Sequence, residues 1–195
     1  MLASITPLGE RGRRGHWGIT ITAFVLGATG AGMTSGALAG GLGATAVGLL
    51  EPQARLAILA AGVMVAIVLD VRARRVPGPR RQVDERWLEE YRGWVYGLGY
   101  GAQLGLGVTT VVTSAATYVA LLAAVLTANP HRGTLVVGCY GAIRGLTLIA
   151  GAGVRNPDQL LSLHARLARA QAPTSRVGLL VLVAIFALAV ARIVT

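Results

Sequence analysis

The chain has 195 residues, of which 54% are hydrophobic and only 13% charged, and its mean hydropathy is +0.63. This composition excludes an ordinary soluble domain and predicts an all-α polytopic membrane protein. The net charge of +10 does not indicate a nucleic-acid partner, because the basic residues lie between apolar runs and form no continuous solvated face.

Five apolar runs are long enough for a transmembrane helix, which needs about 20 residues. The first and third are too long to cross a ~30 Å hydrocarbon core as upright helices, so we expect each to be tilted, broken or extended beyond the membrane. The five runs cover residues 18–48, 53–71, 95–128, 133–153 and 177–194.

The arginines concentrate in residues 1–16, 72–94 and 154–176. Cationic segments beside transmembrane helices stay in the cytoplasm, so the N-terminus is predicted to be cytoplasmic and the C-terminus outside. All 18 basic residues are arginine, which is typical of a GC-rich bacterial genome and favours the bacterial cytoplasmic (inner) membrane. Residues 1–195 are then a single membrane domain.

The two later basic segments each contain a predicted short amphipathic helix. One is VDERWLEEYRGW at 83–94, and the other is NPDQLLSLHARLARAQ at 156–171, which starts with a helix-capping signal. Each is either a solvated connector or a surface that docks a partner.

Residues 30–40 and 105–115 share the pattern Gly-x-Gly-x-Thr-[Ser/Thr] at an offset of 75 positions. Internal repeats are common in transporters, where the substrate path follows the repeat interface. The two segments indicate either such a repeat or a chance match in a glycine-rich chain.

Arg144 lies near the middle of the fourth apolar run, where a guanidinium costs about 2.5 kcal/mol or more. It is therefore expected to face the bundle interior, together with Tyr140 on the same helix face. Four roles fit it: an anion site, a gate, an ion pair with Asp70, or hydrogen bonds to carbonyls of a broken neighbouring helix.

The third run begins with YGLGYGAQLGLG at 96–107, which places an amide among glycines. Hydroxyl side chains follow on one stripe and either line a polar path or bond between helices. The predicted substrate path comprises Gln103, Tyr140, Arg144, Thr110, Thr113, Ser114 and Thr117.

Glycines four residues apart permit close approach of helix backbones, as at Gly32, Gly36 and Gly40. The glycines assigned to helix packing or to a helix break are Gly30, Gly32, Gly97, Gly99, Gly101, Gly105 and Gly107.

Cys139 is the only cysteine, so the chain cannot form an internal disulfide or a multi-cysteine metal site. We expect it to be a small buried apolar residue. The sequence contains no nucleophile-base set, phosphate-binding loop or His/carboxylate cluster. Neither an enzyme nor a bound cofactor or metal is predicted.

Residues 19–194 resemble the CcdA family of cytochrome c biogenesis, which includes the membrane domain of DsbD and belongs to the LysE-like transporter group. The resemblance rests on three segments: YGLGYGAQLG at 96–105, YGAIRGLT at 140–147 and the glycine-rich 23–43. It implies a CcdA-like bundle lacking the family's first span. Ala102 and Gln103 replace the family's Pro-Cys pair, so thiol-disulfide activity is not implied.

Three functions follow as hypotheses. The first is a small-solute or ion carrier with Gln103, Tyr140 and Arg144 along its path. The second is a non-transporting membrane subunit or scaffold that docks a partner in a multi-subunit complex. The third, weaker, is thiol or metal handling by Cys139 with a partner. The expected partners are the lipid bilayer and a second copy or another membrane subunit.

Overall fold

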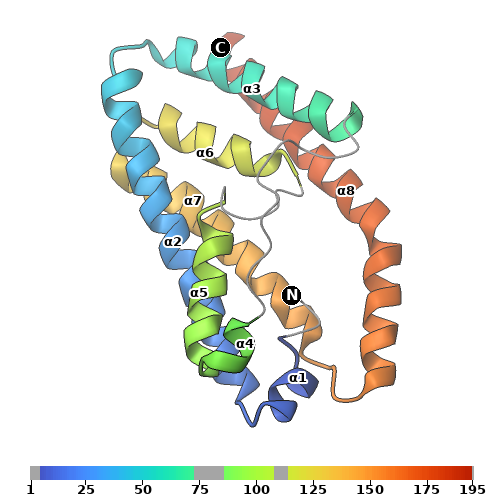
Figure 1. The fold of residues 1–195 in the computed structure, drawn as a ribbon. Coiled ribbons are helices and arrows are strands. Elements are labelled where there is room, and N and C mark those ends of the chain that lie inside the picture. Colours follow the sequence, from blue (N-terminus) through green and yellow to red (C-terminus); the bar gives the residue numbers. More distant parts are fainter. Residues whose placement is uncertain (1–4, 73–85, 108–113, 195) are drawn as a thin grey trace.

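The computed structural model describes residues 5–72, 86–107 and 114–194, and all regular structure within these ranges is helical (Figure 1). The elements are α1 (Pro7–Gly12), α2 (Trp17–Ala46), α3 (Pro52–Arg72), α4 (Trp87–Glu90), α5 (Gly93–Gly105), α6 (Ala116–Leu126), α7 (Pro130–Leu146), the 3-10 helix η1 (Thr147–Gly151) and α8 (Pro157–Val194).

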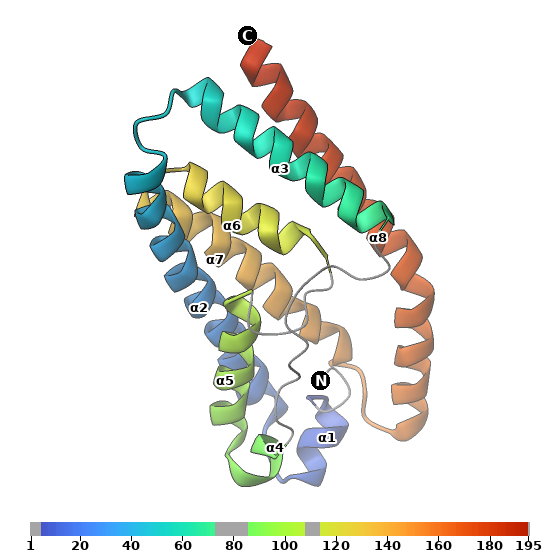
Figure 2. The same ribbon diagram turned by 45° about the horizontal axis from the view of Figure 1, so that its top comes forward.

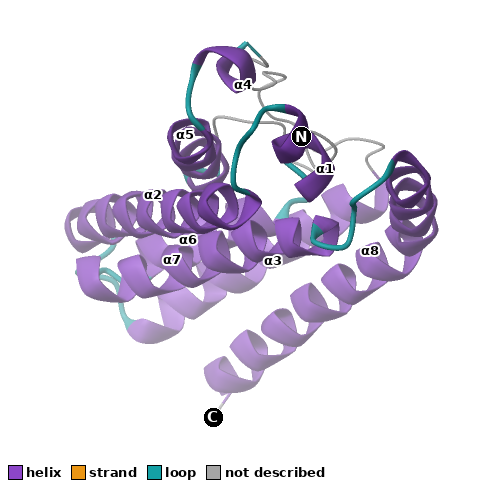
Figure 3. Ribbon diagram, turned by 90° about the horizontal axis from the view of Figure 1, so that it is seen from below, coloured by secondary structure: helices purple, strands orange, loops and turns teal. Residues whose placement is uncertain are grey.

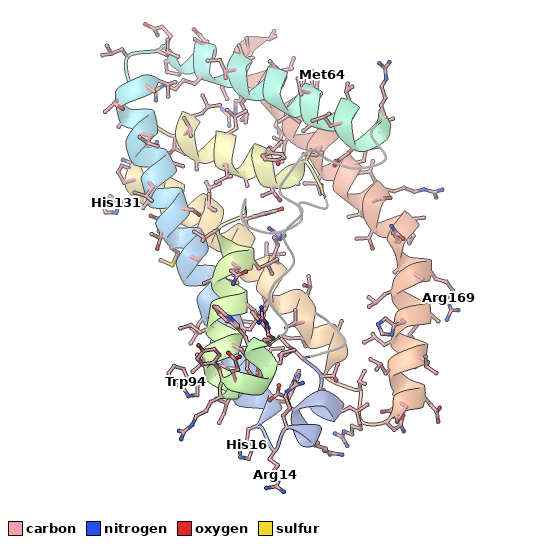
Figure 4. The ribbon with its side chains drawn as sticks, viewed as in Figure 1. Arg14, His16, Met64, Trp94, His131 and Arg169 are labelled. Atoms are coloured by element: carbon pink, nitrogen blue, oxygen red, sulfur yellow. The ribbon has the colours of Figure 1, made fainter. Side chains whose placement is uncertain are left out.

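Four helices are long and apolar enough to span a membrane: Trp17–Ala46, Pro52–Arg72, Pro130–Gly151 and Pro157–Val194. Large apolar side chains on them are exposed, such as Met64 on α3 and Leu180 and Leu188 on α8 (Figure 4). An apolar surface of this extent fits a membrane location, since lipid would cover it.

The third predicted run is not one helix, because α5 ends at Gly105 and α6 begins at Ala116. The first run, in contrast, forms the continuous 30-residue α2. The two segments of the predicted repeat therefore differ in structure: Gly32 lies inside a helix, while its counterpart Gly107 has a φ of 77°.

The predicted helix at 156–171 and the fifth apolar run belong to the same 38-residue helix, α8, which includes Pro173. The Asn156 side chain accepts a hydrogen bond from the Gln159 amide at 2.9 Å, as its capping signal indicates. In the basic segment 83–94, the described part contains the single-turn α4 and the start of α5. Helices α1 and α4 and the beginning of α8 lie at the same end of the molecule (Figure 1).

The helices form two groups. In the first, α2 packs against both α5 and α7, which also contact each other (Figure 3). In the second, α3 packs along α8. Helix α6 lies between α3 and α7 and contacts both groups (Figure 2).

Glycines set the spacing within the first group. A Cβ on Gly36 would overlap the carbonyl of Gly133 on α7, and one on Gly101 would overlap the carbonyl of Phe24 on α2. Four of the glycines assigned to packing or a break approach a backbone carbonyl of a neighbouring helix: Gly32, Gly97, Gly101 and Gly105. Gly30 makes no such contact within the described residues, since it is exposed and has no atom within 4 Å of a Cβ position.

Candidate functional site

The chain leaves the helix of α5 at Leu106 and Gly107. The Leu106 amide still bonds to the Ala102 carbonyl, but Gly107 adopts a left-handed backbone with a φ of 77°. Glycine reaches this conformation without a steric penalty, which ends the helix here. The Leu104 carbonyl in the last turn of α5 accepts the Gly107 amide at 3.3 Å and can accept a second donor.

Arg144 of α7 supplies the second donor to the Leu104 carbonyl. Its Nη1 donates a hydrogen bond to the Leu104 carbonyl oxygen at 3.2 Å. Since the C-terminal end of a helix carries a partial negative charge, a guanidinium there is favourable. This hydrogen bond corresponds to one of the four roles expected for Arg144.

Asp70, at the end of α3, bonds the start of α6, as Arg144 bonds the end of α5. One carboxylate oxygen accepts from the Ala115 amide at 2.9 Å and the other from the Ser114 hydroxyl at 3.0 Å. A carboxylate at a helix N-terminus satisfies amides that have no helical partner and favours their partial positive charge.

The predicted ion pair between Asp70 and Arg144 is therefore wrong. Arg144 bonds the end of α5 and Asp70 bonds the start of α6, the two helices of the third apolar run. A salt bridge joins Arg13 to Glu10, at the N-terminal end. The sequence could not distinguish these arrangements, because the position of the break decides which backbone groups need partners.

Tyr140 connects the two half-helices through α7. Its hydroxyl lies 2.8 Å from Oγ1 of Thr117 on α6, and its ring lies 5.6 Å from the Arg144 guanidinium carbon. Thr117 is buried, while Tyr140 and Arg144 are half-buried. One face of α7 thus bonds both α5, through Arg144, and α6, through Tyr140.

Direct side-chain contacts join three of the predicted path residues, Thr117, Tyr140 and Arg144. Gln103 is half-buried and directly precedes Leu104, whose carbonyl binds Arg144. Ser114 bonds Asp70, and Thr117 bonds Tyr140. Thr110 and Thr113 lie outside the described residues.

The glycine-rich stretch at 96–107 is a regular helix up to Gly105 and does not loosen the span before that point. Its glycines instead serve close packing: Gly97, Gly101 and Gly105 face α2, and Gly99 faces the Trp87 ring. Only Gly107 acts as the predicted helix break.

Cys139 is exposed, so the expectation of a buried apolar residue is wrong. Within the described ranges, no three His, Cys, Asp or Glu side chains group so that they could hold a metal ion.

The structure also contains a buried polar cluster that the sequence did not indicate. Glu10 of α1 is 1% exposed and accepts hydrogen bonds from Arg13 at 2.9 Å, Thr20 at 3.0 Å and the Tyr96 hydroxyl. Burial lowers the pKa of Arg13, but its hydrogen bonds to Glu10 and Tyr96 outweigh this and raise it above the ordinary value. Arg13 is therefore a permanent cation.

One local signal could have located this cluster. Thr6 followed by Pro7 is a helix-start pattern, and the Thr6 hydroxyl accepts from the Gly9 amide at 3.2 Å. It would have predicted α1, but not the contacts of Glu10 with α2 and α5.

No protein-family model matches the chain, and no curated protein or solved structure matches it.

Proposed function

We propose that the protein is an integral membrane transporter of a small solute, with its path at the break between α5 and α6. The supporting observation is that Arg144 bonds the carbonyl end of α5 while Asp70 bonds the amide end of α6. Discontinuous helices of this kind form substrate and ion sites in many transporters, because the exposed helix ends supply partial charges inside the membrane. The resemblance of residues 19–194 to the CcdA family agrees with this proposal.

An anion is the preferred substrate class. Arg144 keeps its charge at any relevant pH and offers five N–H donors, of which one bonds the Leu104 carbonyl. The acidic residue at this break, Asp70, accepts hydrogen bonds from Ser114 and Ala115 at the start of α6. The hydroxyls of Tyr140 and Thr117 add polar groups beside Arg144.

The test is anion flux into proteoliposomes that contain the purified chain. Chloride, nitrate, acetate and phosphate would be followed separately, for the wild type and for Arg144→Ala, Gln103→Ala and Arg132→Ala. Arg132 is the matched control, because it is an exposed arginine on the same helix, α7.

We expect flux of at least one anion, reduced at least tenfold by Arg144→Ala and Gln103→Ala and unchanged by Arg132→Ala. Monodisperse elution of each variant would establish that it is folded. An anion flux that stays at the wild-type level in both Arg144→Ala and Gln103→Ala would refute the proposed path. A folded wild type that moves none of the four anions would favour the alternative function, a membrane subunit that docks a partner.

A further inference from the structure

A basic cavity lies at the N-terminal end of the molecule, at the opposite end of α5 from the break. Its volume is ≈ 620 Å³, and its walls come from the α1–α2 connection, α2, α4 and the start of α5. Arg14, His16 and Trp94 mark this end of the molecule in Figure 4. The cavity is therefore separate from the proposed transport path, and its role does not depend on that path.

The charge of the cavity is positive. Arg13, Arg14 and Arg92 line it, and no aspartate or glutamate is among its described lining residues. Glu10 lies behind the wall and is engaged by Arg13, Thr20 and Tyr96. Within the described residues, Glu10 thus balances one of the three arginine charges, and no salt bridge of Arg14 or Arg92 is found there.

Two helices also begin at this cavity. His16 is the N-cap of α2 and Arg92 the N-cap of α5, and neither side chain makes a capping hydrogen bond. The first amides of both helices therefore have no side-chain cap, and the helix dipoles add positive potential in the same place. Anions bind at such helix ends through backbone amides.

The backbone around the arginines is constrained. Arg14 has a φ of 56°, a left-handed conformation that is uncommon for residues other than glycine. A Cβ on Gly93 would overlap the Thr20 hydroxyl and lie 3.3 Å from a carboxylate oxygen of Glu10. Gly93 thus lets α5 begin close against the Glu10 cluster, which holds Arg13 at the cavity wall.

We propose that this cavity binds a phosphate group, carried either by an anionic phospholipid or by free phosphate. Guanidinium groups match the phosphate geometry through paired N–H donors, and three arginines line this cavity. Tyr91 and Trp94 are 49% and 52% exposed at the same cavity. Aromatic residues of this type concentrate at the level of lipid headgroups, so the lipid is the favoured source.

The experiment compares the full chain with Arg14→Gln/Arg92→Gln and with a control of equal charge change, Arg11→Gln/Arg166→Gln. Both control arginines are exposed and neither lines the cavity. Each protein, purified in a neutral detergent, is titrated with short-chain phosphatidylglycerol in one arm and with inorganic phosphate in the other. Binding is measured by native mass spectrometry for the lipid and by calorimetry for phosphate, and elution profiles verify folding.

We expect the cavity variant to bind at least tenfold more weakly than the wild type in at least one arm, and the control to bind within twofold of it. Loss in the lipid arm alone identifies a headgroup site, and loss in the phosphate arm alone identifies a site for free phosphate. Equal weakening of the cavity variant and the control would overturn the proposal, since it would mean that net charge alone attracts the ligand. Absence of binding to the folded wild type in both arms would also overturn it.

Discussion

Asp70 and Ser114 are bonded across two helices, with 3.0 Å between the carboxylate and the hydroxyl, although 44 positions separate them in the sequence. The same carboxylate accepts the Ala115 amide, so the end of α3 caps the start of α6. This relationship explains how an 11-residue helix can begin within the body of the protein: Asp70 bonds the Ala115 amide, and the Ser114 hydroxyl accepts the Ala116 amide at 3.2 Å.

Removing the Asp70 charge should destabilise this junction. For Asp70→Asn we expect a loss of about 0.3–1 kcal/mol in the free energy of unfolding, the usual range for a charge at a helix end. The matched control is Asp158→Asn, because Asp158 is an exposed acid in the first turn of α8. Denaturant titration in detergent measures both, and an equal effect of the two substitutions would contradict a special role for Asp70.

The hydrogen bond between Tyr140 and Thr117 should couple α7 to α6. A double-mutant cycle with Tyr140→Phe and Thr117→Val is expected to give a coupling of about 0.6 kcal/mol, the average for such bonds within membranes. Tyr140→Phe keeps the ring beside Arg144, so only the hydroxyl is tested.

The control cycle pairs Tyr140→Phe with Thr134→Val, since the Thr134 hydroxyl bonds the Pro130 carbonyl within α7 itself. Unfolding free energies should be additive there. Additivity in the Tyr140–Thr117 cycle as well would show that their 2.8 Å contact contributes no stability.

Alanine at two glycines of α2 should have opposite effects. Gly36→Ala places a methyl group against the Gly133 carbonyl and must separate α2 from α7, for an expected loss of about 1–3 kcal/mol. Gly30→Ala meets open space, and we expect a gain of up to about 1 kcal/mol from the better helix propensity of alanine.

Thermal unfolding in detergent distinguishes the two glycine variants directly. A destabilised Gly30→Ala would mean that a second chain covers this face of α2. An unaffected Gly36→Ala would mean that α2 and α7 are not in backbone contact.

The sequence predicted the features that follow from local rules. Apolar runs located the long helices, and the four-residue spacing of Gly32, Gly36 and Gly40 predicted close packing, since spacing on a helix fixes which residues share a face. The role of Arg144 as a donor to a broken helix was among the predictions, because a guanidinium within an apolar run must find acceptors inside the protein.

Features that depend on distant segments could not be obtained in this way. The partner of Asp70 depends on where the third run breaks, and glycines at several positions of 96–107 were equally good candidates for that break. The contacts of Glu10 require α1, α2 and α5 to meet, and no periodicity in residues 1–16 records that meeting. Gly30 lacks a packing contact within the chain for a similar reason, since the spacing of glycines does not reveal which face of α2 receives a neighbour.

The glycine contacts of α2 also have a mechanical consequence. Where backbone meets backbone, no side chain can change rotamer to absorb a shift, so α2, α5 and α7 must move as one stiff body. Between α3 and α8 the contact is made by larger side chains such as Leu59, Leu182 and Phe186, which can readjust as the helices slide. The Val125 carbonyl of α6 also lies against Gly43 of α2, so α6 moves with the stiff body, and its contact with Asp70 is where displacement of one group reaches the other.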